Sequence, residues 1–126
     1  MKTATPQDTC DHMMGAGALS FSWWRYATVA GVGAAGDVLG DGWTATVRCE
    51  DPDDGRKSVT RQFGHADVIK AARKVVKAGR PGIPGTTREM FDQCKHLVFS
   101  ADYADFDACT SDELLQVIVL GKVAFG

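Results

Sequence analysis

The 126-residue sequence contains no apolar run of the roughly eighteen or more residues that a membrane span needs, so we expect no membrane partner. Residues 1–8 lack the apolar core of a secretion signal, which predicts a cytoplasmic protein. Disulfides are rare in that compartment. The four cysteines are therefore expected to be free thiols.

Motifs that mark catalysis are also missing. The chain has no G-x-S-x-G, H-E-x-x-H or Walker phosphate-binding sequence, and no C-x-x-C or H-x-x-x-H spacing. Cys10 and His12, like Cys94 and His96, are two residues apart in predicted helices, where side chains point about 200° apart and cannot hold one ion together. We expect a non-enzymatic protein without cofactor or metal; a Cys–His nucleophile pair formed only by the fold stays an open alternative.

No charge of one sign dominates the chain, whose formal net charge is −2. Nucleic-acid-binding domains tend to be basic, so a nucleic-acid partner is less favoured than other partners. The charge is nevertheless segregated, because residues 56–80 hold eight basic side chains against one acidic, between two acidic flanks. This pattern suits an anion-binding surface, internal charge pairing or complementary surfaces between subunits.

The length predicts a single domain spanning residues 1–126. Thr5 and Pro6 favour a helix start, and this helix is expected to run to Gly15 or Leu19. Apolar–polar alternation predicts three strands, with a turn at residues 51–55 joining the last two. The expected strands cover residues 20–30, 43–49 and 57–63, and residues 31–42 form a glycine-rich connection.

Three helices follow the predicted strands. Helical periodicity covers residues 66–79 and 86–99 and resumes at residue 110. Thr86 with Glu89, and Thr110 with Glu113, have the spacing of capping boxes that open the last two helices. This order predicts an α+β fold with an N-terminal helix, a three-stranded antiparallel sheet and three C-terminal helices.

A basic stripe on the helix at residues 66–79 is the leading candidate for a binding surface. The spacing i, i+3, i+4, i+7 places its four cations on one helical face, opposite an apolar stripe. Such a face suits a nucleotide-like anion or an acidic surface of a host protein, and a purely solvated face is the alternative. Arg48 and Arg61, on neighbouring strands, are expected to add bidentate contacts. The stripe consists of Lys70, Arg73, Lys74 and Lys77.

Adjacent tryptophans mark a second candidate surface. Trp23 and Trp24 are predicted on a strand, where neighbouring side chains point to opposite faces. One can join the core, while the other needs a helix layer, a subunit or a ligand to cover it. With Arg25 they are candidate binding residues, and together with the segregated charge they favour a homo-oligomer.

Residues 31–36 match the dinucleotide fingerprint G-x-G-x-x-G after a predicted strand. The fingerprint works only where a helix opens at the loop and directs its N-terminus at the pyrophosphate. Here the next predicted element is a strand. We interpret the glycines as a connection between strands.

The apolar run at residues 114–120 continues almost to Phe125, which predicts that the last residues are tied into the fold or into a partner. This ending and the segment Leu-Ser-Phe-Ser-Trp-Trp-Arg-Tyr at residues 19–26 resemble a family of small bacteriophage and prophage proteins, common in phages of actinobacteria. That family has an aromatic Tyr-Trp segment near its start and an ending like Leu-Phe-Gly-Glu-Val-Val-Tyr-Gly; Lys122 stands where an acid is usual. The resemblance implies a phage accessory protein in the host cytoplasm, one that blocks a host defence enzyme or sequesters its signal nucleotide.

Overall fold

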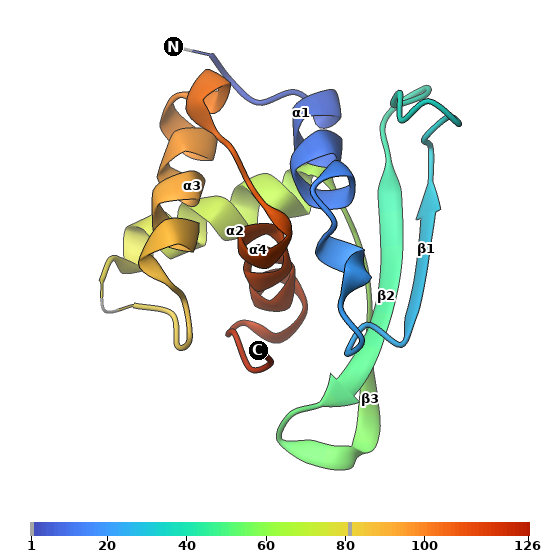
Figure 1. The fold of residues 1–126 in the computed structure, drawn as a ribbon, viewed down its shortest axis with the longest axis vertical. Helices are drawn as coiled ribbons and strands as arrows, with labels where there is room; N and C mark the ends of the chain where they lie inside the picture. Colours follow the sequence, from blue (N-terminus) through green and yellow to red (C-terminus); the bar gives the residue numbers. More distant parts are fainter. Residues whose placement is uncertain (1, 81) are drawn as a thin grey trace.

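The computed structural model of the protein describes residues 2–80 and 82–126. It confirms the predicted α+β fold: an N-terminal helix, a three-stranded antiparallel sheet in the order β1-β2-β3, and three further helices. The helices gather on one side of the sheet (Figure 1). The elements are α1 (Pro6–Cys10), β1 (Tyr26–Ala30), β2 (Thr44–Asp51), β3 (Asp54–Gly64), α2 (His65–Ala78), α3 (Arg88–Phe99) and α4 (Ala108–Leu120).

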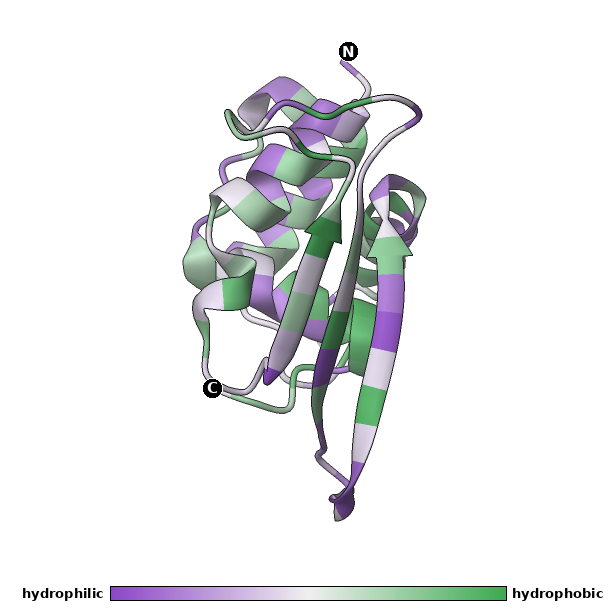
Figure 2. Ribbon diagram, turned by 90° about the vertical axis from the view of Figure 1, so that its right-hand side faces the viewer, coloured by the Kyte–Doolittle hydropathy of each residue, from purple (hydrophilic) through white to green (hydrophobic). Residues whose placement is uncertain are grey.

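The sheet buries one face and leaves the other open. In β2, Ala45, Val47 and Cys49 are buried in the core, whereas Thr44 and Arg48 are exposed. This is the period-2 alternation of a strand with one face covered. The sheet lies in the foreground of Figure 2, where its strands alternate between hydrophilic and hydrophobic residues. The edge strand β1 pairs only with β2, and all five of its residues are exposed.

Two N-terminal elements are shorter than predicted. Thr5 does cap α1, with Pro6 in its first turn, but the α-helix ends at Cys10 and continues as a π-helical turn, Asp11–Gly15. The left-handed backbone of Gly17, with φ of 97°, then excludes a regular helix. β1 begins at Tyr26 and not at residue 20, because residues 21–24 form a bend in which the N–H of Trp24 donates to the carbonyl of Phe21 across 3.2 Å.

The glycine-rich loop connects β1 to β2, as interpreted from the sequence. No helix begins within residues 31–43, all of which the structure describes. Gly31 has a φ of 78°, and a Cβ there would collide with the carbonyl oxygen of Gly42. The side chain of Gln7 ties the loop to α1, donating to the carbonyl of Gly36 (3.0 Å) and accepting from the N–H of Val38 (2.8 Å). These glycines therefore shape a turn and offer no helix N-terminus to a phosphate.

Both capping residues predicted for the last two helices are wrong. The hydroxyl of Thr86 donates to the carbonyl of Ile83 (2.9 Å), which leaves Thr87 to cap α3 by accepting from the N–H of Met90 (3.3 Å). At α4 the cap is Asp107, whose carboxylate accepts from the N–H of Thr110 across 2.8 Å. The cap of α3 thus lies one residue after the predicted Thr86, and the cap of α4 lies three residues before the predicted Thr110.

The C-terminal residues are tied into the fold through Gln116 of α4, which is fully buried. Its Oε1 accepts from the backbone N–H groups of Ala124 and Phe125, at 2.8 Å each, and its Nε2 donates to the carbonyl of Phe125 across 3.0 Å. The N–H of Val123 also donates to the carbonyl of Pro84 (2.9 Å). One side chain thus supplies three of the hydrogen bonds that hold the tail against α4.

Candidate functional site

The four basic residues of α2 form a continuous exposed surface, here called the basic face: Lys70, Arg73, Lys74 and Lys77. On the opposite side of the helix Val68, Ala72 and Val75 are buried, which confirms the predicted amphipathic pattern. Within the described residues, none of the four cations forms an ion pair with an acidic side chain. Their charge is therefore not neutralised by the protein itself.

A hollow of about 360 Å³, here called the α2 hollow, lies on one flank of the basic face. Its polar lining comes from Thr3, His65, Lys70 and Arg73, and its apolar lining includes Ile69, Leu97 and Val98. This combination places two cations at the rim of a partly apolar depression. A volume of this size is at the lower end of small-molecule sites, which are roughly 300–1,000 Å³.

A smaller groove of about 160 Å³ lies on the other flank, between α2 and α4. Arg61, Lys70 and Lys74 line it together with Asp67. Lys70 therefore borders both depressions. Lys77, one turn further along α2, lines neither of them.

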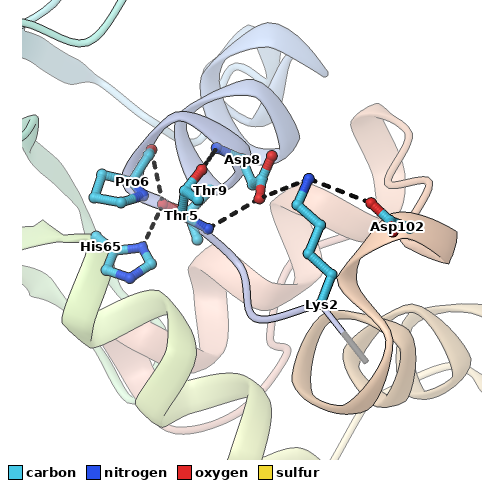
Figure 3. A network of polar contacts seen from close by, with 7 residues as sticks. All are labelled: Lys2, Thr5, Pro6, Asp8, Thr9, His65 and Asp102. Atoms are coloured by element: carbon cyan, nitrogen blue, oxygen red, sulfur yellow. Dashed lines mark hydrogen bonds and ion pairs between the residues drawn. The ribbon is translucent and has the colours of Figure 1, made fainter.

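The N-terminal segment forms one wall of the α2 hollow, and a polar network fixes it in place (Figure 3). The ammonium of Lys2 lies 3.6 Å from a carboxylate oxygen of Asp8 and 3.3 Å from one of Asp102. The hydroxyl of Thr9 and Nδ1 of His65 are hydrogen-bonded across 2.9 Å (Figure 3). Burial lowers the pKa of His65 and so favours its neutral imidazole, whereas Lys70 and Arg73 supply the positive charge of the hollow.

The three arginines predicted as additional binding residues, Arg25, Arg48 and Arg61, do not lie together in the structure. Arg61 pairs across the sheet with Val47, whereas Arg48 pairs with Thr60, so the two guanidinium groups lie on opposite faces of the sheet. Arg61 joins the basic face and is held by Asp67, with Nη2 at 3.1 Å from Oδ1. The prediction that Arg48 adds a contact beside Arg61 is therefore wrong.

Arg48 and Arg25 contact residues outside the basic face. The guanidinium of Arg48 lies over the ring of Tyr26, 5.7 Å from its centroid. Arg25 lies 3.9 Å from the carboxylate of Glu50. Neither arginine lines the α2 hollow or the groove beside it.

The tryptophan pair is not arranged on opposite faces of a strand, and that prediction is wrong. Because both residues precede β1 in a bend, Trp23 and Trp24 can donate their indole N–H groups to the same atom, Oδ1 of Asp112, across 2.9 Å and 2.6 Å. Trp24 is buried, and Trp23 is half-buried between the rings of Phe21 and Phe125. The chain covers Trp24 and half of Trp23, so the pair no longer requires a subunit to cover an exposed indole.

Asp112 and Gln116 are the residues that sequence reasoning missed. The structure buries both, with 3% of Asp112 exposed, and joins them by a 2.8 Å bond from Nε2 to Oδ2. A glutamine inside the apolar run 114–120 was a signal that could have been used, because a buried amide must find partners. No local pattern links Asp112 to residues near the start of the chain.

Three of the four cysteines are buried, and Cys109 is exposed. Burial raises the pKa values of the Cys10 and Cys49 thiols, and that of Cys94 to about 12. A thiol with a raised pKa carries little of the reactive thiolate. Among residues 2–80 and 82–126, no three His, Cys, Asp or Glu side chains converge in a group that would hold a metal ion.

Comparison with known proteins gives no match, whether to protein-family models, to curated proteins or to solved structures. In the part of the chain that the structure describes, no helix is both long and apolar enough to cross a membrane.

Proposed function

We propose that the protein acts by binding and not by catalysis, and that its ligand is a small, multiply charged anion of nucleotide-like character bound at the basic face of α2. The observation that carries the proposal is the row of four exposed cations on α2, of which Lys70 and Arg73 line the α2 hollow. Following the phage resemblance, we further propose an accessory role in the host cytoplasm, in host takeover or counter-defence.

The chemistry of the α2 hollow supports this ligand class. The planar guanidinium of Arg73 can bind two oxygens of one phosphate group, and the ammonium of Lys70, one turn away on α2, can form a further ion pair with it. Ile69 and Leu97 offer apolar surface to an uncharged part such as a nucleobase. Each charge-assisted contact that is shielded from water contributes about 1.5–3 kcal/mol, and an exposed one contributes less.

Calorimetric titration tests the proposal with a nucleoside triphosphate, a cyclic nucleotide and a short single-stranded oligonucleotide. Alanine at Lys70, Arg73, Lys74 and Lys77 should weaken binding at least tenfold. A control variant, alanine at Arg88 and Lys95, removes two exposed cations from α3 and should leave affinity unchanged. Equal loss in both variants, or no binding of any anion to the wild type, would exclude the basic face as the site.

Nucleic-acid binding through residues 56–80 is the alternative. Arg56 and Lys57, next to the turn between β2 and β3, extend the basic segment beyond α2 and are exposed. Only a long ligand can reach these residues and α2 together. Alanine at Arg56 and Lys57 should therefore weaken oligonucleotide binding and reduce its salt dependence, while leaving a mononucleotide unaffected.

Self-association is also part of the proposal, with β1 as the contact. Its outer edge carries backbone groups that no strand in the described part of the chain pairs. Tyr26, Val29 and Leu39, in β1 and the following loop, are 48%, 41% and 55% exposed. An uncovered edge with apolar side chains is a template for another strand.

A further inference from the structure

A second hollow, of about 390 Å³, lies beside the C-terminal tail and has a different chemistry from the α2 hollow. We call it the tail hollow. It lies between the bend at residues 21–23, the beginning of α4 and the segment 123–126. Its described lining contains two side-chain carboxylates, those of Asp112 and Glu113, and no lysine, arginine or histidine.

Aromatic rings form one wall of the tail hollow. The rings of Phe21 and Trp23 are stacked, with centroids 4.8 Å apart and planes 9° apart. The ring of Phe125 is also stacked with that of Trp23, with centroids 6.0 Å apart and planes 17° apart. Aromatic faces carry negative charge density and attract cations, most strongly where water is excluded.

The carboxylates of the tail hollow have no positive counter-charge in the described part of the chain. Asp112 is 3% exposed, and its hydrogen-bond partners are all neutral: the indoles of Trp23 and Trp24 and the amide of Gln116. Glu113 is half-buried and accepts from the N–H and hydroxyl of Thr87 across 3.2 Å and 3.3 Å. Burial raises the pKa values of both acids, as expected where nothing positive offsets the lost hydration.

We infer that the tail hollow binds a small organic cation, a guanidinium or primary ammonium group on a short apolar or aromatic body. The cationic group would pair with Glu113 at the rim and approach the charge of Asp112 behind it. The body would lie against Phe21, Trp23 and Phe125. A planar guanidinium suits this setting because it can stack on an aromatic face while it binds a carboxylate through two N–H groups.

The same chemistry exists in two sources, a free amine or guanidine and the lysine or arginine side chain of a partner protein. Three probes distinguish them: phenethylammonium, agmatine and the blocked peptide acetyl-Gly-Arg-Gly-amide. Binding of the free cations without the peptide identifies a small-molecule site. Tighter binding of the peptide identifies the side chain of a partner as the ligand group. Both outcomes support the cation site.

The test is titration of the full chain with each probe, measured by calorimetry and by tryptophan fluorescence, to which Trp23 contributes together with Trp24 and Trp43. Phenethylammonium should bind at least tenfold more tightly than 2-phenylethanol, which has nearly the same shape without the charge. Glu113→Gln preserves the hydrogen-bonding shape but removes the charge, and should weaken cation binding at least tenfold. The control Asp41→Asn removes an exposed carboxylate from the β1–β2 loop, far from the C-terminus in Figure 1, and should change nothing.

Phe125→Leu provides a second variant, which removes one ring of the aromatic wall and leaves both carboxylates in place. It should weaken the binding of phenethylammonium severalfold. Thermal melting of each variant checks that the fold is kept. The inference is overturned if the alcohol binds as tightly as the ammonium, if folded Glu113→Gln keeps wild-type affinity, or if no cation binds at millimolar concentration. Anion binding at the basic face does not depend on any of these results.

Discussion

Trp24 and Asp112 are 88 residues apart in sequence, yet the indole N–H of one donates to Oδ1 of the other across 2.6 Å in the core. Trp23 donates to the same oxygen, and Gln116 donates to the other oxygen of the carboxylate. Gln116 also holds the backbone of the C-terminal tail. One buried polar cluster therefore joins the bend before β1, α4 and the tail.

Replacing Asp112 by alanine should lower the free energy of unfolding by about 3 kcal/mol, because three donors lose their acceptor. Asp112→Asn should cost less, since its oxygen can still accept from both indoles and only the bond from Gln116 is lost, because the new NH2 group faces the NH2 group of Gln116. Urea denaturation followed by tryptophan fluorescence measures both. Asp105→Ala, an exposed control, should stay within about 0.5 kcal/mol of wild type. An unchanged midpoint for Asp112→Ala would contradict the prediction.

The sequence predicted those parts of the fold that depend on local periodicity. The apolar and basic stripes of α2, the β2–β3 hairpin and the order of elements all follow from spacing over a few residues. The cap of α1 was also predictable, since the bonds of the capping box join Thr5 and Asp8, which are three residues apart, and Pro6 stands at the first helical position.

Features set by tertiary contacts could not be predicted in this way. Trp23 and Trp24 lie in a bend because a carboxylate from α4 binds both indoles, and alternation cannot reveal that acceptor. Glu113 was assigned to a capping box but bonds instead to Thr87 at the start of α3. The separation of Arg48 from Arg61 followed from the register, which fixes the face of every strand residue.

Deletion of residues 123–126 should destabilise the protein by roughly 3 kcal/mol. It removes the half-buried Phe125, and it also removes the backbone N–H groups that donate to the buried amide oxygen of Gln116. In a chain of this size the melting temperature should fall by about 10 °C. Lys122→Ala loses only an exposed ion pair with Asp53 and serves as the control. A truncated protein that melts with the wild type would refute the structural role of the tail.

Acidification from pH 7.5 to pH 5 should cost stability through His65. Burial lowers its folded-state pKa below the unfolded value of 6.5, so the folded state binds its proton less readily. The contribution is present above pH 6.5 and is lost as pH falls through the folded pKa. His12, whose pKa burial also lowers, acts in the same direction, whereas the raised pKa values of Asp112 and Glu113 act in the opposite one.

The contribution of His65 is isolated by comparing His65→Gln with the wild type at both pH values. The variant should lose less unfolding free energy on acidification, with Nε2 or Oε1 of the glutamine able to contact Thr9. Equal losses in the two proteins would show that the imidazole does not couple to folding. Charge on the neighbouring Asp8 is unchanged by the substitution.

Glycines of the loop at residues 31–36 should differ in their tolerance of alanine. Gly31→Ala should destabilise by about 2 kcal/mol or more, because its φ is 78° and its Cβ would collide with the carbonyl of Gly42. At Gly33 the nearest atoms lie 3.7 Å from an added Cβ, so Gly33→Ala should be nearly neutral. Neither should change anion affinity in folded protein. Loss of nucleotide binding in Gly33→Ala would restore the loop as a phosphate site.

Self-association through β1 should respond to a single charge. Antiparallel pairing of two copies about Thr28 would place Tyr26 opposite Ala30 and Ala27 opposite Val29, so a large side chain meets a small one on each face. Lysine on an edge strand opposes such pairing. Val29→Lys should therefore shift the protein toward the monomer in sedimentation experiments at micromolar concentration, without loss of melting temperature, because Val29 is 41% exposed.

The matched control is Thr60→Lys, which adds the same charge to an exposed residue of β3. It should leave the sedimentation of the wild type unchanged, since β3 is not the proposed contact. If Thr60→Lys dissociates the assembly as strongly as Val29→Lys, repulsion between charged copies explains the effect and the edge of β1 does not. If the wild type sediments only as a 13.5 kDa species, the protein does not self-associate at that concentration. A second copy of the chain then does not cover the exposed apolar residues of β1.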